Sequence, residues 1–241
     1  MEPDIDALFA PIAPSAAYQA VLGEARALLP RVREPLDAEL WGSDMLGALS
    51  RTVARPADLM SELASSLVPA AEREATPQAL ALLRVLAALG SAELRTTSTQ
   101  SAERIKALGI ADPDWARGLG TPEPGACWHY ADVSGQQESL TATFAYGTKE
   151  HALSVLIDHN QGGKIRDAWA GDAAGLLDKT WLAAENDPGV EFEKIGAAEA
   201  GDRLLRAVRA GETPQKPDEA DAITAHRALL LSRLSLLLTL T

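Results

Sequence analysis

One short stretch of the chain gathers residues that could do acid–base or metal chemistry. Asp158, His159 and Asn160 end an apolar run, and Asp167 follows the glycine pair Gly162-Gly163. A carboxylate beside an imidazole can move protons or help to hold a metal ion. The same residue types are common at strand ends, where their side chains bond exposed backbone groups. The stretch is therefore either a functional site or the polar end of a hairpin.

Strand geometry predicts how these side chains meet. Successive strand residues point to opposite faces, so His159 shares a face with Val155 and Ile157. A bulged turn through the glycines would place Asp167 on that face, opposite His159. The hairpin end is the expected ligand-binding site, with the residues Asp158, His159, Asn160, Lys164, Asp167 and Trp169.

Two further motifs offer less chemistry. Cys127 and His129 alternate on one predicted strand, but zinc needs three or four ligands, and no Cys-x-x-Cys or His-Glu-x-x-His spacing is present. Lys164 follows two glycines but precedes Ile165 and a predicted strand, whereas a phosphate-binding loop needs Ser or Thr and then a helix. The sequence therefore assigns no metal and no cofactor, and it leaves open whether the protein is an enzyme.

The elements before the linker are predicted to be helices. Leu and Ala recur at three- and four-residue spacing, and Thr76-Pro77 predicts an N-cap followed by proline at the first helical position. Gly90 is placed to end that helix, and a later one is expected around Glu103–Leu108. Thr121-Pro-Glu-Pro-Gly125 breaks the pattern and predicts a linker. Residues 1–120 are thus a predicted helical region.

After the linker the pattern changes to strands. Short glycine-bearing connectors separate four apolar or alternating runs, which predicts a four-stranded antiparallel meander near 126–170. The runs are Ala126–Val133, Ser139–Tyr146, Ala152–Ile157 and Lys164–Ala170, with Val190–Ile195 as a fifth candidate. With C-terminal helices packed on this sheet, the predicted fold class is α+β. Its regions are 1–120 and 121–241, which can also form one continuous domain.

Two apolar groups could either form core or meet a ligand or partner. The aromatic residues of the predicted sheet are Trp128, Tyr130, Phe144, Tyr146 and Trp169. The last helix is apolar almost all round, with a stripe of Ile223, Leu230, Leu234 and Leu237. Such a helix must be buried, either within its own domain or at a subunit interface.

Composition limits the partners. The chain has 241 residues, 46% of them hydrophobic, and a net charge of −12. Nucleic acids and anionic membranes attract clustered Lys and Arg, so neither is an expected partner. Cys127 is the only cysteine, and the acidic start lacks a signal-peptide pattern, so we expect a cytoplasmic protein. The final apolar run carries Arg233 and is shorter than the ~20 residues that span a bilayer.

Several of these motifs also carry a resemblance. The segment from Trp115-Ala-Arg-Gly-Leu-Gly through Gln137-Glu-Ser-Leu, Phe144-Ala-Tyr-Gly and Leu156-Ile-Asp-His-Asn-Gln-Gly-Gly to Asp167-Ala-Trp resembles a group of actinobacterial proteins with no assigned function. The resemblance covers the middle third of the chain well. It implies that the glycine hairpin belongs to a defined module, and it implies no activity, cofactor or catalytic residue.

These observations favour a binding or regulatory protein without catalytic activity. The sheet module would engage a protein or a small-molecule ligand. The first alternative is a metal-assisted hydrolase centred on His159 and Asp167, with Asp158 nearby. The second is a homo-oligomeric scaffold joined through the C-terminal helix.

Overall fold

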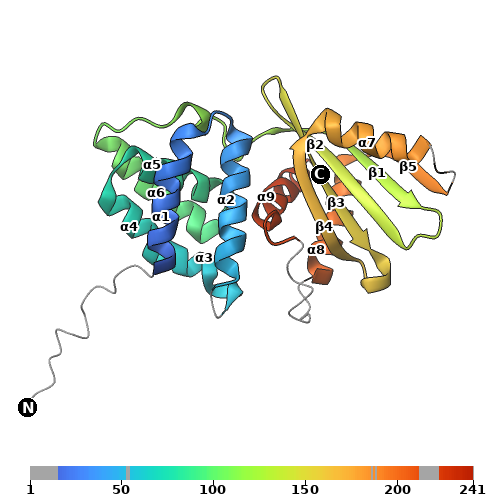
Figure 1. The fold of residues 1–241 in the computed structure, drawn as a ribbon, viewed down its shortest axis with the longest axis horizontal. Helices are drawn as coiled ribbons and strands as arrows, with labels where there is room; N and C mark the ends of the chain where they lie inside the picture. Colours follow the sequence, from blue (N-terminus) through green and yellow to red (C-terminus); the bar gives the residue numbers. More distant parts are fainter. Residues whose placement is uncertain (1–15, 53–54, 186, 188, 212–222, 241) are drawn as a thin grey trace, which may run out of the picture.

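A computed structural model describes residues 16–52, 55–185, 187, 189–211 and 223–240. Helices at both ends of the chain flank an antiparallel sheet, so the fold is α+β, as predicted (Figure 1). The helical part and the sheet lie side by side, and the C-terminal helix lies between them.

The helical part is built around one apolar helix. Its helices are α1 (Ala16–Leu28), α2 (Pro35–Ser50), α3 (Leu59–Glu62), α4 (Val68–Glu74), α5 (Pro77–Leu89) and α6 (Ala92–Ala107), and its short turns are η2 (Leu29–Arg31), η3 (Pro56–Asp58), the π-helical η4 (Leu63–Leu67) and η5 (Asp114–Ala116). The predicted N-cap of α5 is confirmed, because the Ala79 N–H donates to Thr76 Oγ1 at 3.1 Å. Leu80, Leu83 and Leu86 of this helix are fully buried, since α1, α2, α4 and α6 all pack against it.

Helix α6 is longer than the sequence pattern predicts. The expected helix around Glu103–Leu108 is only its last part, and the helix begins just after its cap, Ser91. Its first half is rich in threonine, which obscures the apolar period. The Thr96 and Thr97 hydroxyls donate to backbone carbonyls one turn earlier, so these polar residues are satisfied within the helix.

The sheet contains the predicted meander and one more strand. Its strands are β1 (Glu123–Asp132), β2 (Gln137–Tyr146), β3 (Lys149–Asp158), β4 (Lys164–Asp172) and β5 (Val190–Ile195). Their order is β4-β3-β2-β1-β5, and all neighbours are antiparallel. The expectation of four strands is thus corrected to five, because Val190–Ile195 pairs with β1. The helices of this part are α7 (Ala173–Glu185), α8 (Ala197–Gly211) and α9 (Arg227–Leu238), and η6 (His159–Gln161) joins β3 to β4.

The two faces of the sheet differ in chemistry. One face carries Leu140, Leu153 and Val155, which form a buried core with α8 and α9. The other face, against which α7 packs, carries the hydroxyls of Thr141 and Ser154, joined by a 2.9 Å hydrogen bond. Apolar packing is therefore concentrated on the face of the sheet that α8 and α9 cover.

Helix α9 joins the two cores. Leu229 belongs to the core of the helical part, whereas Leu230, Leu234 and Leu237 belong to the core beneath the sheet. The chain just before α9 passes so close to α2 that a Cβ on Gly47 would lie 2.4 Å from the Thr224 carbonyl oxygen. Leu230, Leu234 and Leu237 of the predicted stripe are thus buried within their own chain, whereas Ile223 lies before α9 and is half-buried.

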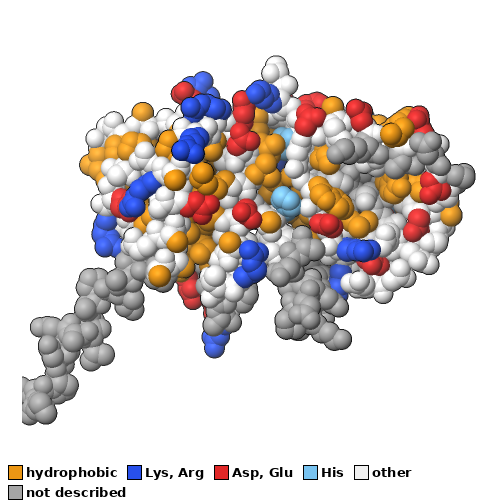
Figure 2. All heavy atoms as spheres, viewed as in Figure 1, with side chains coloured by type: hydrophobic (Ala, Val, Ile, Leu, Met, Phe, Trp, Pro, Cys, Tyr) orange, Lys and Arg blue, Asp and Glu red, His pale blue; other side chains and the backbone are white. Residues whose placement is uncertain are grey.

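No helix in the described ranges is both long enough and apolar enough to cross a membrane. Figure 2 shows basic and acidic side chains interspersed on the viewed face, with no basic stripe running across both parts.

Candidate functional site

The hairpin between β3 and β4 is held by its own polar residues. Gly162 and Gly163 have φ values of 78° and 76°, a conformation that glycine adopts without steric cost. The Gly163 N–H donates to the Asp158 carbonyl at 3.0 Å, and the Asn160 N–H donates to the Asp158 carboxylate at 2.9 Å. Asp158 is buried, so its side chain serves this turn.

The strand register separates His159 from Asp167. Leu156 pairs with Asp167 and Ile157 pairs with Ile165, so Arg166 is an extra residue in β4. This bulge places Asp167 on the face opposite to that of Ile157, and the expected approach of His159 and Asp167 is therefore wrong. A metal-assisted hydrolase centred on these two residues loses its geometric basis.

Asp167 and Trp169 have other surroundings. The Asp167 carboxylate accepts the Ala168 N–H at 2.8 Å, which satisfies a backbone donor of an edge strand. Trp169 pairs with Ser154 and is 41% exposed. Lys164 pairs with Asp158 at the base of the hairpin and is half-buried. These side chains surround the hairpin but do not converge on one point.

His159 meets a different carboxylate, that of Glu138. Its Nε2 lies 3.1 Å from Glu138 Oε1, and its side chain is 45% exposed. Glu138 lies on β2 opposite Ile157, on the face to which the strand alternation assigns His159. The buried Glu138 thus orients an exposed imidazole at the surface of the hairpin.

Two more donors fix this carboxylate. Glu138 Oε2 lies 2.8 Å from His129 Nε2 and accepts a 2.8 Å bond from Arg203 Nη1, contributed by α8. Arg203 also donates to Glu199 at 2.7 Å. We refer to Glu138, His129, His159 and Arg203 as the Glu138 cluster. It joins β1, β2, η6 and α8 at one end of the sheet.

The electrostatics of the cluster favour an ionised Glu138. Burial raises the pKa of this carboxyl, but the hydrogen bond and charge of Arg203, together with His129, hold the pKa below its usual value. His129 Nδ1 is buried with no hydrogen-bond partner in the described residues, and the Glu193 carboxylate lies 3.5 Å away. The cluster is therefore a charged network in which His159 is the most exposed of the four side chains, at 45%, and Arg203 is 27% exposed.

Sequence reasoning missed Glu138, His129 and Arg203 as a set. Glu138 falls at the end of the polar run Ser134-Gly-Gln-Gln-Glu138, which reads as a connector, yet β2 begins at Gln137. Glu138 is separated from Leu140 and Phe144 by even numbers of positions, so the strand alternation places it on the same apolar face. This spacing could have indicated the cluster, because a glutamate on an apolar face needs polar partners.

Cys127 and three of the aromatic residues, Trp128, Phe144 and Tyr146, take structural roles. Cys127 is buried, and no three His, Cys, Asp or Glu side chains in the described ranges are arranged to hold a metal ion. Phe144 and Tyr146 stack on His151 with centroid distances of 5.7 Å, and Trp128 stacks on Phe192 at 5.2 Å. These rings pack against one another within the protein.

The chemistry available at the hairpin is that of an oriented imidazole. With Nε2 bound to Glu138, His159 presents Nδ1, for which the described residues provide no hydrogen-bond partner. Within those residues, His159 also has no hydrogen bond to a hydroxyl or thiol that it could activate as a nucleophile. This arrangement suits recognition of a hydrogen-bond donor better than covalent catalysis.

Comparison of the chain with protein-family models, with curated proteins and with solved structures found no match.

Proposed function

We propose that this is a cytoplasmic, non-catalytic binding protein whose sheet module engages a protein partner at the end of the β3–β4 hairpin. The observation that carries the proposal is the exposed His159 held by the buried Glu138. A cytoplasmic setting agrees with the single, buried cysteine, and the interspersed surface charges give no support to a nucleic-acid partner.

The free-energy cost of burying the charged groups of the Glu138 cluster supports a role in recognition. Burying charged groups is expensive unless each is paired, and apolar residues of similar volume often stabilise a fold equally well. Here Glu138 is fixed by Arg203 and His129, and the result is one ordered imidazole at the surface. Such preorganisation reduces the entropy lost when a partner binds.

The hairpin presents groups suited to a protein surface. Beside His159, the exposed Asn160 offers its side-chain amide, which lies 3.4 Å from Gln136 Oε1. A partner would donate a hydrogen bond to His159 Nδ1 and accept one from Asn160. The exposed Trp169 pairs with Ser154 on the opposite face of the sheet, so it is not part of this surface.

Photo-crosslinking in the producing cells tests this proposal. A photoreactive amino acid is placed at Gln161, which is exposed on η6, and separately at Leu108, which is 70% exposed in the helical part. We expect a discrete protein adduct from position 161 that is absent from position 108 and is lost when His159→Ala is added. Equal adducts in the presence and absence of His159→Ala, with unchanged circular dichroism, contradict the proposal.

A further inference from the structure

An apolar surface is exposed where helix α7 ends and β5 begins. Trp181 and Leu182, in the second half of α7, are 51% and 61% exposed. Val133, which follows β1, is 70% exposed, and its N–H donates to the Gly189 carbonyl just before β5 at 2.9 Å. Three of the eight large apolar side chains that are exposed in the described residues thus lie at this end of the molecule.

Aromatic neighbours hold Trp181 in place. Its ring meets the Phe192 ring of β5 edge-on with centroids 5.5 Å apart, and Phe192 in turn stacks on Trp128 of β1. Trp181 Nε1 donates to Glu185 Oε1 at 2.6 Å, one turn further along α7. An exposed tryptophan whose ring is fixed in this way is a typical anchor of a protein interface. We refer to the residues Val133, Trp181, Leu182 and Phe192 as the α7 patch.

The α7 patch lies among carboxylates. Residues 178–194 contain five Asp and Glu residues and two Lys residues, a net charge of −3, 2 − 5. Figure 2 shows acidic side chains beside apolar ones over α7 and β5. Next to Val133, hydrogen bonds from the Ser134 hydroxyl and the Gln136 N–H hold the pKa of the Asp132 carboxyl below its usual value. The surroundings of the patch are therefore negative at neutral pH.

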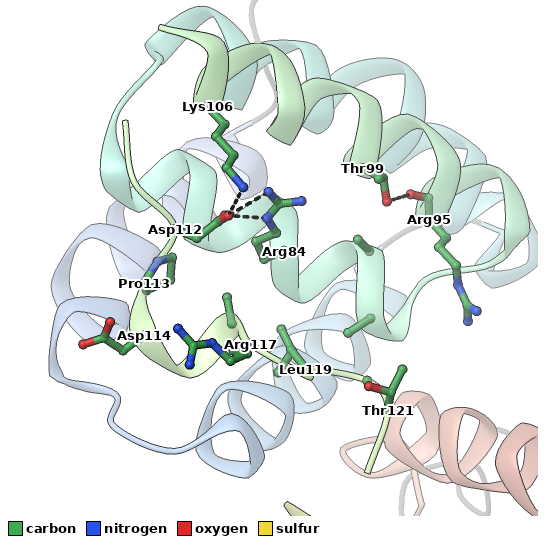
Figure 3. Close-up of a pocket in the computed structure, with 14 residues that line it drawn as sticks. Arg84, Arg95, Thr99, Lys106, Asp112, Pro113, Asp114, Arg117, Leu119 and Thr121 are labelled. Carbon is green, nitrogen blue, oxygen red and sulfur yellow. Dashed lines mark hydrogen bonds and ion pairs between the residues drawn. The ribbon is translucent and has the colours of Figure 1, made fainter. Parts of the chain in front are cut away.

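Two of these carboxylates are free to meet a cation from outside. Around the hollow drawn in Figure 3, charges are used within the chain, and Arg84 Nε lies 2.6 Å from Asp112 Oδ1 to fasten the segment before β1. Glu185 and Asp187 are both exposed and accept hydrogen bonds from uncharged donors. Neither has an ion pair with a side chain in the described part of the chain.

Charge decides which occupant fits this surface. The segments 1–15 and 212–222 of the same chain each have a net side-chain charge of −3, 0 − 3 and 1 − 4. A second copy of the chain would bring the same acidic surroundings against the patch, which is unfavourable. Anionic membranes and nucleic acids are repelled for the same reason. A positively charged polypeptide is attracted.

We propose that the α7 patch docks a basic amphipathic segment of another protein. An apolar side chain of that segment would pack on Trp181 and Leu182, and its Lys or Arg side chains would face Glu185 and Asp187. A cation over the exposed part of the Trp181 ring would add attraction. This surface does not include His159, so the proposal does not depend on the hairpin site.

Fluorescence anisotropy of labelled synthetic peptides with the full chain tests the proposal. The probe is a peptide of Lys-Leu-Leu repeats, and the comparison peptides consist of Glu-Leu-Leu and Lys-Ser-Ser repeats. We expect saturable one-to-one binding of the probe, about tenfold or more tighter than that of either comparison peptide. Absence of saturable binding, or equal binding of the probe and either comparison peptide, overturns the proposal.

Matched variants locate the binding. Trp181→Gln should weaken it about tenfold or more. Trp169→Gln changes a 41% exposed tryptophan on β4, at the other edge of the sheet, and should leave the affinity unchanged. Glu185→Gln with Asp187→Asn keeps both hydrogen-bond acceptors but removes two charges, so it should weaken binding and reduce its dependence on salt.

Three results would contradict this location. The probe could bind the Trp181 and the Glu185–Asp187 variants as tightly as the wild type, or Trp169→Gln could weaken binding as much as Trp181→Gln. Sedimentation velocity gives the third, a dimer of the wild type that Trp181→Gln abolishes. Such a dimer would assign the α7 patch to a second copy of the chain and overturn the proposal.

Discussion

Arg233 and Glu39 stand 194 positions apart in the chain, and their side chains form an ion pair that is wholly buried. Arg233 Nη1 donates to Glu39 Oε1 at 3.0 Å, and Nε donates to His151 Nε2 at 3.2 Å. The guanidinium also lies 5.4 Å from the centroid of the Phe144 ring. One charged side chain thus connects α2, α9 and the sheet at the junction of the two parts.

Removing only one partner of this ion pair should lower the free energy of unfolding. In Arg233→Met the Glu39 carboxylate stays buried without its cation, so we expect the free energy of unfolding to fall by about 3–5 kcal/mol. Adding Glu39→Leu removes the stranded charge and should restore part of the loss. Urea denaturation followed by circular dichroism measures both variants. A double variant no more stable than the single one contradicts the role of the stranded charge.

Acid should weaken the same junction through His151. Burial, followed by the charge of Arg233, lowers the pKa of His151 from 6.5 to about 4. Between these two pH values His151 is protonated in the unfolded chain but stays neutral in the folded chain. The contribution of His151 to the free energy of unfolding is therefore complete above pH 6.5 and decreases as the pH drops towards 4. The difference in pKa corresponds to roughly 3 kcal/mol.

His151→Gln isolates this contribution. Glutamine keeps an acceptor for Arg233 but does not titrate, so the variant should lose less stability than the wild type between pH 6.5 and 4. Urea midpoints at several pH values compare the two chains. Parallel profiles in this range would mean that His151 is not the group responsible.

The fold class could be predicted from the hydrophobic periodicity of the sequence and from its helix-capping residues. Thr76-Pro77 and the short connectors after Gly125 depend on local geometry, so they predicted α5 and the meander correctly. The pairing of Val190–Ile195 with β1 joins segments distant in sequence, which no local pattern encodes. Arg233 reads only as one charge in an apolar helix, because its partner Glu39 lies at the other end of the chain.

The β3–β4 hairpin was predicted from the sequence, but the contacts of its side chains were not. The hairpin end and His159 were identified because glycine and polar residues cluster there. Their partner depended on the register of β4, and a single extra residue, Arg166, turned Asp167 to the other face. Glu138 took its place from β2.

The thiol of Cys127 should be inert in the folded protein. The residue is 2% exposed, and burial raises its pKa, with Lys194 only partly opposing the effect. The nucleophilic species is the thiolate, so reaction with an aromatic disulfide reagent at pH 8 should be slow. In urea above the unfolding midpoint one thiol should react at the rate of a free cysteine. Rapid reaction of the native protein would show that the sheet opens at β1.

Glu138→Gln should loosen the cluster while preserving its shape. Both His129 and Arg203 approach Oε2, and His159 approaches Oε1, so an amide leaves at least one of these donors facing its NH₂ group. Since a hydrogen bond to a charged group contributes about 1.5–3 kcal/mol, we expect the free energy of unfolding to fall by about 2 kcal/mol.

The same change should release the exposed imidazole. Without a charged acceptor for Nε2, the His159 ring should gain motion, which side-chain NMR relaxation can measure. Glu193→Gln is the control, because its carboxylate lies on β5 with a side chain 60% exposed and contacts only His129 in the cluster. We expect the control to leave His159 ordered. If Glu138→Gln keeps His159 as rigid as in the wild type, the hairpin itself orders the ring, and the Glu138 cluster loses its role in presenting it.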